Sequence, residues 1–308
     1  MANSLSTVKN AGNIIAKEAA MVLHDNLSFL KTIDVEDDSV FRKKLEGSRA
    51  GDTIDISKPT QFTVRTGATY SAQNVTESQA ALTVATQRGV DFEFTSAELS
   101  TDIEKYSKRV IQPAIKLLAS HIENKVMTDL FTQVHNQVGT AGTSPNALLT
   151  YLKAGTKLSQ DLTPVSDRHV LINAQAAEAS IDALKGLYQD SSEVAKQYRE
   201  GVMGKTAGFT FAQNELIPTW TSGSQGGSPV TDGVDQTGAT IDIDGVSSGN
   251  TWTEGTVFTI AGVNKVHPET KADLGVLQQF TVTADTTFTG GSASVPISPA
   301  LTATGAAQ

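Results

Sequence analysis

The stretch from Ser100 to Asn136 constrains this chain most, because its apolar residues recur about every four positions. That spacing is the period of an amphipathic α-helix with a wide apolar stripe. The two apolar rows contain Ile103, Tyr106, Val110, Ala114, Leu118, Ile122, Val126, Leu130 and Val134, and Ile111, Ile115, Met127 and Phe131. Glu123 lies between the rows with several other charged residues, and we expect it to face water.

A helix of this length would span roughly 54 Å at about 1.5 Å per residue, which exceeds what a compact domain of this size needs. Pro113 interrupts the stripe and predicts either a kink or a fresh helix start after a short first segment. Two interpretations stay open: a buried core helix, or a spine along which a flat, elongated subunit is built.

Composition favours several thin domains over one thick enzyme core. The chain has 308 residues, enough for two or three domains, with 39% hydrophobic and 6% aromatic residues. Its net charge is −9 and its basic runs are short, the longest being Arg42-Lys43-Lys44. High-affinity electrostatic binding of nucleic acid needs a concentrated basic face, so this pattern argues against that class.

Several other classes are excluded or disfavoured by what the sequence lacks. Without cysteine, the chain forms no disulfide, thiolate metal site or cysteine nucleophile. No apolar run approaches the roughly 20 residues of a membrane span, and the N-terminus shows no basic region followed by an apolar core. We therefore expect no membrane segment and no signal peptide.

Residues 47–98 alternate between apolar and polar side chains, which is typical of β-strands. The alternating runs are 51–56, 62–65, 81–86 and 90–94. The simplest arrangement is a long β-hairpin with a polar distal end near residues 66–79. A long hairpin leaves unpaired edges that suit docking on another subunit.

The C-terminal half changes character twice. Residues 139–220 predict an α/β segment, with a strand at His169–Ile172 and a helix from Gln175 to Tyr188. Residues 221–305 contain short β runs separated by glycines, which predicts a small barrel or sandwich. Those runs are 239–243, 257–260 and 279–282.

No pattern of catalytic, metal-binding or cofactor-binding residues stands out. The five histidines, at positions 24, 121, 135, 169 and 267, have no partner at metal-ligand spacing. Asp242-Ile243-Asp244-Gly245 lacks the further oxygen ligands of a calcium loop, and we interpret Asp244-Gly245 as a hairpin turn. Gly201 to Thr206 has two residues between its glycines where a phosphate loop needs four. We expect no enzyme activity, no metal and no cofactor.

The order of elements resembles the major capsid proteins of tailed bacteriophages with the Hong Kong 97-type fold. Within that family it is similar to the subgroup with an inserted β-domain, which includes the coat protein of Salmonella phage P-twenty-two. The stretches that carry the resemblance are 51–59, 92–99, 110–114, 206–209, 255–263 and 277–282. The resemblance covers nearly the whole chain, although no single motif is diagnostic.

The resemblance implies an α+β, Hong Kong 97-like capsid fold with an inserted small all-β domain. Its parts would be an N-terminal arm (1–46), an extended β-hairpin loop (47–90), a peripheral domain with the spine helix (91–138), an axial α/β domain (139–220), the inserted β-domain (221–301) and a tail (302–308). Family chains usually continue beyond the insertion to complete the axial and peripheral domains. We therefore expect this sequence to be truncated relative to the family.

The implied function is a major capsid protein that self-assembles through pentamers and hexamers into an icosahedral shell around double-stranded DNA. Implied partners are other copies of the chain, a scaffolding protein, a portal, head decoration or tail-connector proteins, and packaged DNA bound without sequence specificity. Its location would be the virion, with assembly in the cytoplasm of the host bacterium. Candidate inter-subunit contacts are Lys43, Lys44, Arg65 and Arg88.

Two other functions stay open from the residues alone. A surface adhesin would use residues 221–305 as its ligand-binding domain and would need clustered exposed aromatic side chains. The available aromatics, at positions suited to a core, are Trp220, Trp252, Phe258, Phe280 and Phe288. A hydrolase or transferase would need a nucleophile and a base, and no such pair is apparent in the sequence.

Overall fold

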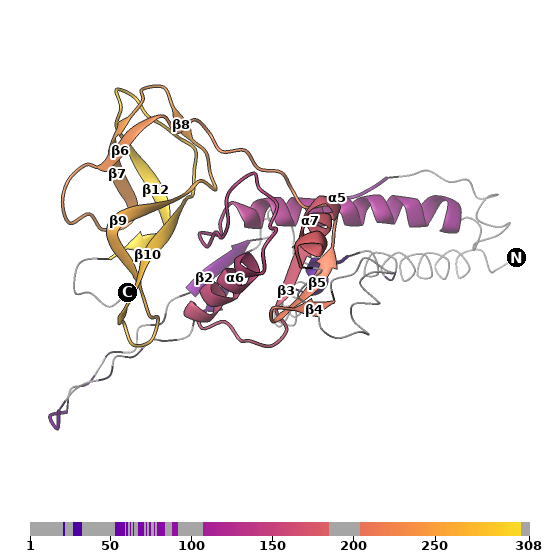
Figure 1. The fold of residues 1–308 in the computed structure, drawn as a ribbon, viewed down its shortest axis with the longest axis horizontal. Helices are drawn as coiled ribbons and strands as arrows, with labels where there is room; N and C mark the ends of the chain where they lie inside the picture. The colour runs from indigo at the N-terminus through magenta and orange to yellow at the C-terminus, as the bar shows by residue number, and fades with distance from the viewer. Residues whose placement is uncertain are drawn as a thin grey trace, which may run out of the picture. The chain divides into compact units, whose positions relative to one another are not determined.

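The computed structural model describes Met21 and residues 27–32, 53–58, 79–83, 88–91, 107–184 and 204–302, with isolated positions between 60 and 77. The rest of the predicted N-terminal arm, residues 100–106 of the expected long helix, and residues 185–203 lie outside this part. The described structure is mixed α+β and rich in sheet (Figure 1).

The chain divides into two compact units, each made of two separate stretches of the sequence. The first consists of Met1–Asn26 and Leu30–Ala119, and the second of Leu27–Phe29 and Ser120–Gln308. Thus the short segment Leu27–Phe29 belongs with residues that follow it by more than 90 positions. The five boundaries between the six predicted parts stay predictions.

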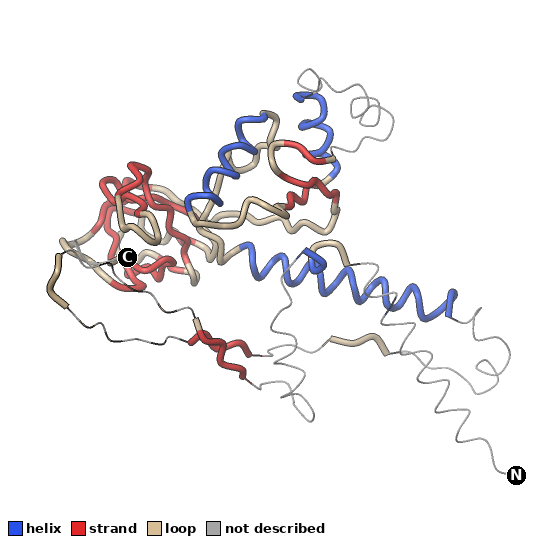
Figure 2. The backbone as a smooth tube through the Cα atoms, turned by 90° about the horizontal axis from the view of Figure 1, so that it is seen from below, coloured by secondary structure: helices blue, strands red, loops and turns tan. Residues whose placement is uncertain are grey.

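The first unit contains a 3-10 turn, a two-stranded hairpin and the start of the long helix. The turn is η1 (Leu30–Thr32). Strands β1 (Thr53–Ser57) and β2 (Gln79–Thr83) pair in antiparallel fashion, with Ile54 opposite Leu82 (Figure 2). The alternating pattern in the sequence therefore predicted this pairing correctly, while Phe62 and Val64 lie outside any strand.

The predicted long helix is observed in a shorter form. A π-helical turn, η2 (Ser107–Ile111), precedes the α-helix α5 (Gln112–Phe131). Pro113 is the second residue of α5 and lies just after the π-helical turn, so the helical backbone passes through the proline without a break. The helix ends at Phe131 instead of continuing to Asn136, because residues 132–137 make hydrogen bonds to later segments of the chain.

An α/β lobe follows in the second unit. Strand β3 (His169–Ile172) runs parallel to β5 (Phe209–Gln213), and β4 (Lys205–Thr206) pairs with β5 in antiparallel fashion. Helix α6 (Leu148–Gln160) precedes β3, and α7 (Ala174–Leu184) follows it, which confirms most of the helix expected from Gln175. Helix α6 was not predicted.

The lobe has a small core of its own. Tyr151 of α6 meets Phe211 of β5 edge to face, with ring centroids 5.1 Å apart. The Tyr151 hydroxyl also shares a 2.5 Å hydrogen bond with the buried Ser180 hydroxyl of α7. These contacts join both helices to the parallel pair, so the lobe is a layer of helices on a three-stranded sheet.

Residues 227–301, called the β-module below, form an antiparallel sheet in the strand order β6-β7-β12-β10-β9. A second, two-stranded sheet pairs β8 with β11. The strands are β6 (Gly227–Thr231), β7 (Gly238–Val246), β8 (Thr251–Trp252), β9 (Val257–Val266), β10 (Asp273–Val282), β11 (Thr286–Thr287) and β12 (Ala293–Leu301). The three β runs expected from sequence lie within β7, β9 and β10.

The core of the β-module is aromatic and β-branched. Trp252 packs edge to face against Phe288 with ring centroids 5.2 Å apart, and it meets Phe258 at 5.3 Å. The buried members of this core are Ile241, Ile243, Val246, Trp252, Phe280, Val282, Phe288, Val295 and Ile297. They come from β7, β8, β10 and β12 and from the loop after β11, so the core ties both sheets together.

The interpretation of Asp244-Gly245 as a hairpin turn is wrong. Gly245 lies inside β7, where φ is +79° and the pairing with β6 shifts register. A Cβ on Gly245 would stand 2.4 Å from the carbonyl oxygen of Ser228. The glycine therefore permits an irregularity in the middle of the sheet and not a reversal of the chain.

Candidate interaction sites

The connection between β1 and β2 exposes three large apolar side chains. Phe62, Val64 and Tyr70 are 64%, 98% and 82% exposed, respectively. They all belong to the connection between Ser57 and Gln79. The sequence predicted a strand at 62–65 and a polar hairpin end only at 66–79, which contains Tyr70. A set of exposed apolar residues on one segment is a candidate surface for contact with another protein.

The four basic residues proposed as inter-subunit contacts are only partly placed. Arg88 is exposed in the described segment 88–91. Lys43, Lys44 and Arg65 lie outside the described residues. Because only Arg88 is placed, the role of all four residues stays a prediction.

Glu123 of α5 is the clearest departure from the sequence-based expectation. Its side chain is only 1% exposed, although the pattern of the helix predicted that it would face water. Its Oε1 atom accepts hydrogen bonds from the backbone N–H and the hydroxyl of Ser28, at 2.9 and 2.8 Å, and from the N–H of Phe29. A buried carboxylate is tolerated here because three donors replace its water.

Asn214, directly after β5, completes this arrangement, which we call the Glu123 cluster (Ser28, Phe29, Glu123 and Asn214). Its Nδ2 atom donates to the Ser28 hydroxyl at 2.6 Å and lies 3.3 Å from Glu123 Oε1. Its Oδ1 atom accepts from the N–H of Leu216 at 2.7 Å. The cluster thus joins three segments that are separated by more than 90 residues in sequence.

A second polar cluster lies between the α/β lobe and the β-module. Lys157 of α6 donates to the carbonyl of Gln137 at 2.9 Å and to Gln279 Oε1 of β10. Asp161, which follows α6, forms an ion pair with Lys265 of β9. We call this set, together with Asn136 and His135, the junction cluster.

Electrostatics in the junction cluster disfavour extra positive charge. Burial, which is the largest cause, lowers the pKa of His135, and the Lys265 and Lys157 ammonium groups act in the same direction. Burial and the Lys265 ammonium lower the pKa of Lys157, while Asp161 opposes both shifts. Asp161 is also held by Asn136, whose Nδ2 atom donates to it at 2.7 Å. The carboxylate of Asp161 therefore favours the charged forms of both Lys157 and Lys265, and the cluster links α6 to the β-module.

Neither cluster has the composition of a metal centre. Within the described residues, no group of three or more histidine, aspartate or glutamate side chains is arranged to hold a metal ion. In the same residues, no helix combines the length and apolarity needed to cross a membrane.

The aromatic residues that an adhesin would need at its surface lie largely inside the β-module. Trp252, Phe280 and Phe288 are buried, and Phe258 packs against them. Trp220 packs against Phe131 with ring centroids 6.1 Å apart, and its Nε1 atom donates to the carbonyl of Glu254. These aromatics are therefore occupied in packing and do not form an open sugar-binding face.

Comparisons with known proteins find distant similarity to solved structures. No family model and no curated protein matches the chain. A solved chain from Mycobacterium phage Che8 is similar over 88% of this chain and 86% of its own length, at 15% sequence identity and a TM-score of 0.44. A similarity at this level assigns the chain to no family.

Proposed function

We propose that this chain is a major capsid protein that self-assembles through pentamers and hexamers into an icosahedral shell around double-stranded DNA. The observation that carries the proposal is the exposed apolar set Phe62, Val64 and Tyr70 on the β1–β2 connection. Exposed apolar side chains such as these leave water when a neighbouring copy covers them. The ordered resemblance in sequence supports the same conclusion.

The mechanism is the repetition of modest contacts. Full burial of a side chain such as phenylalanine or valine contributes roughly 1.5–3 kcal/mol, so Phe62 and Val64 together contribute about 3–6 kcal/mol per copy as an upper bound. Each contact alone is weak after the entropy of association is subtracted. Closed symmetry repeats the same contact in every subunit and makes assembly cooperative.

The partners follow from this role. The chain would bind other copies of itself, a scaffolding protein and a portal, and decoration or tail-connector proteins would join later. The net charge of −9 suits a shell that encloses DNA without binding its sequence. The proposed location is the virion, after assembly in the bacterial cytoplasm, and the proposed role is structural and not enzymatic.

The test is a triple substitution, Phe62→Ser with Val64→Ser and Tyr70→Ser. Because the three side chains are exposed, the variant should keep the circular dichroism spectrum and thermal midpoint of the unchanged protein. Negative-stain electron microscopy, with the scaffolding partner co-expressed, should show shells for the unchanged protein and none for the variant.

Val165→Ser is the matched control, because Val165 is 74% exposed and lies in the α/β lobe outside the hairpin. It should assemble like the unchanged protein. Normal shells from the triple variant would remove the hairpin from the assembly mechanism. A dispersed monomer from the unchanged protein, with and without scaffold, would contradict the capsid proposal itself.

A further inference from the structure

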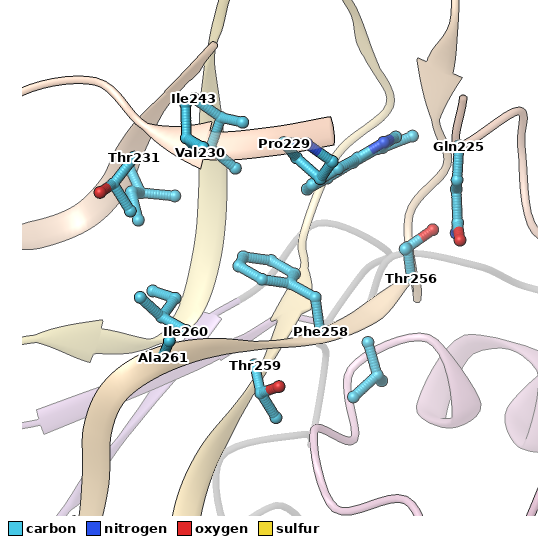
Figure 3. A pocket seen from close by; sticks show the side chains of 13 residues that line it. Gln225, Pro229, Val230, Thr231, Ile243, Thr256, Phe258, Thr259, Ile260 and Ala261 are labelled. Carbon is cyan, nitrogen blue, oxygen red and sulfur yellow. The ribbon is translucent and has the colours of Figure 1, made fainter. Parts of the chain in front are cut away.

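The β-module contains a cavity of about 430 Å³ between the two end strands of its sheet. One wall is formed by β6, with Pro229 and Val230, and the other by β9, with Phe258 and Ile260. Figure 3 shows these two walls facing each other. The sheet therefore curls until its first and last strands line the same opening.

Both of these strands have an edge without a partner. In the described part of the chain, β6 pairs only with β7, and β9 pairs only with β10. The free edge of a strand carries a row of backbone donors and acceptors that can bind another extended chain. Because both free edges border the same cavity, one further strand lying between them could pair with both.

Two polar atoms in the lining have no hydrogen-bond partner. Trp252 and Thr256 are 5% and 3% exposed, and both Trp252 Nε1 and Thr256 Oγ1 are buried without a partner. Both atoms are closed off from solvent, so they lie behind the surface of the cavity and not on it. Figure 3 places the Thr256 hydroxyl near the same end as Gln225, so this end is polar.

The rest of the lining fixes the character of the occupant. None of the residues that line the cavity carries a charge. At the opposite end Figure 3 shows Ile243 and Ile260 together with Thr231, so this end is mainly apolar. An uncharged chain with small β-branched side chains on one face would fit, whereas a charged side chain would lose its hydration without gaining a partner.

We propose that this cavity binds an uncharged peptide segment in an extended conformation, which adds to the sheet as a strand between β6 and β9. Backbone groups of the segment pair with the two free edges. Valine or threonine side chains on its inner face fill the apolar end. This mode of recognition obtains affinity from main-chain hydrogen bonds and specificity from alternate side chains, which a small apolar molecule cannot reproduce along two edges.

Trp252 itself reports on the site once the other tryptophan is removed. The chain has two tryptophans, so Trp220→Phe leaves Trp252 as the sole emitter in the full-length protein. Titration with acetyl-Ser-Gln-Val-Thr-Val-Gln-Ser-amide should give a saturable change in emission, and hydrogen exchange should slow at amides of β6 and β9.

The matched probe is the same peptide with alternate backbone nitrogens methylated, which removes the donors along one edge and keeps the side chains. We expect about tenfold weaker binding for each hydrogen bond lost. Equal binding of both peptides, or saturable binding of 1-hexanol alone with no peptide effect, would overturn strand addition. Absence of any emission change up to millimolar peptide would also overturn it.

A pair of variants tests whether the peptide binds in the cavity or elsewhere on the β-module. Val230→Lys places a charge at the mouth, where the side chain is 58% exposed, so the fold should survive while peptide affinity falls at least about tenfold. Val234→Lys is the control, because Val234 is 90% exposed and lies outside the lining. Equal affinity of the two variants would place the peptide elsewhere.

Discussion

Glu123→Gln should weaken the attachment of the segment Leu27–Phe29 to the rest of the second unit. The substitution keeps the shape of the side chain and one acceptor oxygen, and it removes the negative charge. Three strong donors converge on Glu123 Oε1: the N–H and hydroxyl of Ser28 and the N–H of Phe29. The fourth contact, from Asn214 at 3.3 Å, is longer and adds less.

The magnitude follows from the difference between charged and neutral hydrogen bonds. A bond to a charged group contributes about 1.5–3 kcal/mol and a neutral one about 0.5–1.5 kcal/mol. Three bonds that each lose about 1 kcal/mol give a local loss of about 3 kcal/mol. Because the segment can then open and its donors can reach water, we expect a measured loss of about 2–3 kcal/mol.

Hydrogen–deuterium exchange at the Ser28 and Phe29 amides measures this local opening directly. A loss of 2–3 kcal/mol corresponds to exchange that is roughly 30- to 150-fold faster. Asp129→Asn is the control on the same helix, since Asp129 is exposed and pairs only with Lys125 at the surface. That surface pair is expected to contribute at most about 1 kcal/mol.

Two results would refute the reasoning. The first is exchange in Glu123→Gln that stays within about threefold of the unchanged protein, which would mean that the charge does not hold the segment. The second is an equal acceleration in Asp129→Asn, which would indicate a general loosening of α5. Ser28→Ala tests the same cluster from the other side, and it should accelerate exchange less, because the carboxylate and both N–H donors remain.

The remaining predictions concern pH and backbone geometry. Because burial lowers the folded-state pKa of His135 below its ordinary value of 6.5, the unfolded chain binds the proton more readily. Stability should therefore fall as pH drops below 6.5 toward the folded-state pKa. His135→Asn should reduce the change of the thermal midpoint with pH over that range, and an unchanged pH dependence would contradict this. Gly245→Ala should destabilise the β-module more than Gly262→Ala in urea unfolding. Both positions have a positive φ, which costs alanine about 1–2 kcal/mol, but only at Gly245 would the Cβ meet backbone, at 2.4 Å; equal losses would remove the steric argument.

The secondary structure that the sequence predicted correctly rests on local patterns. Alternation predicted β1 and β2, and the apolar runs predicted parts of β7, β9 and β10. Pro113 predicted a kink or a fresh helix start, and the structure shows instead a change from π-helical to α-helical geometry directly before it. Helix α6 was missed although its leucines have helical spacing, and its N-cap residue, Ala147, gives no side-chain capping signal.

The candidate sites depended on contacts that no local pattern contains. Glu123 has the helix position of a solvent-exposed residue, and only the distant donors of Ser28 and Phe29 make its burial tolerable. Likewise, the pairing of Asp161 with Lys265 joins residues more than 100 positions apart. A sequence pattern reports periodicity along one element, so it cannot show which distant polar group replaces water.

By itself, the sequence determined the mixed α+β class, the β1–β2 hairpin, the all-β character of the C-terminal module and the absence of cysteine chemistry. These properties follow from periodicity, turn residues and composition, which act over a few positions of the chain. Tertiary structure alone decided that Glu123 is buried, that α5 ends at Phe131, and that β6 and β9 face each other across an open cavity. Each of these outcomes depends on which polar groups and strand edges find partners far away in the sequence, and that pairing is settled only when the chain packs.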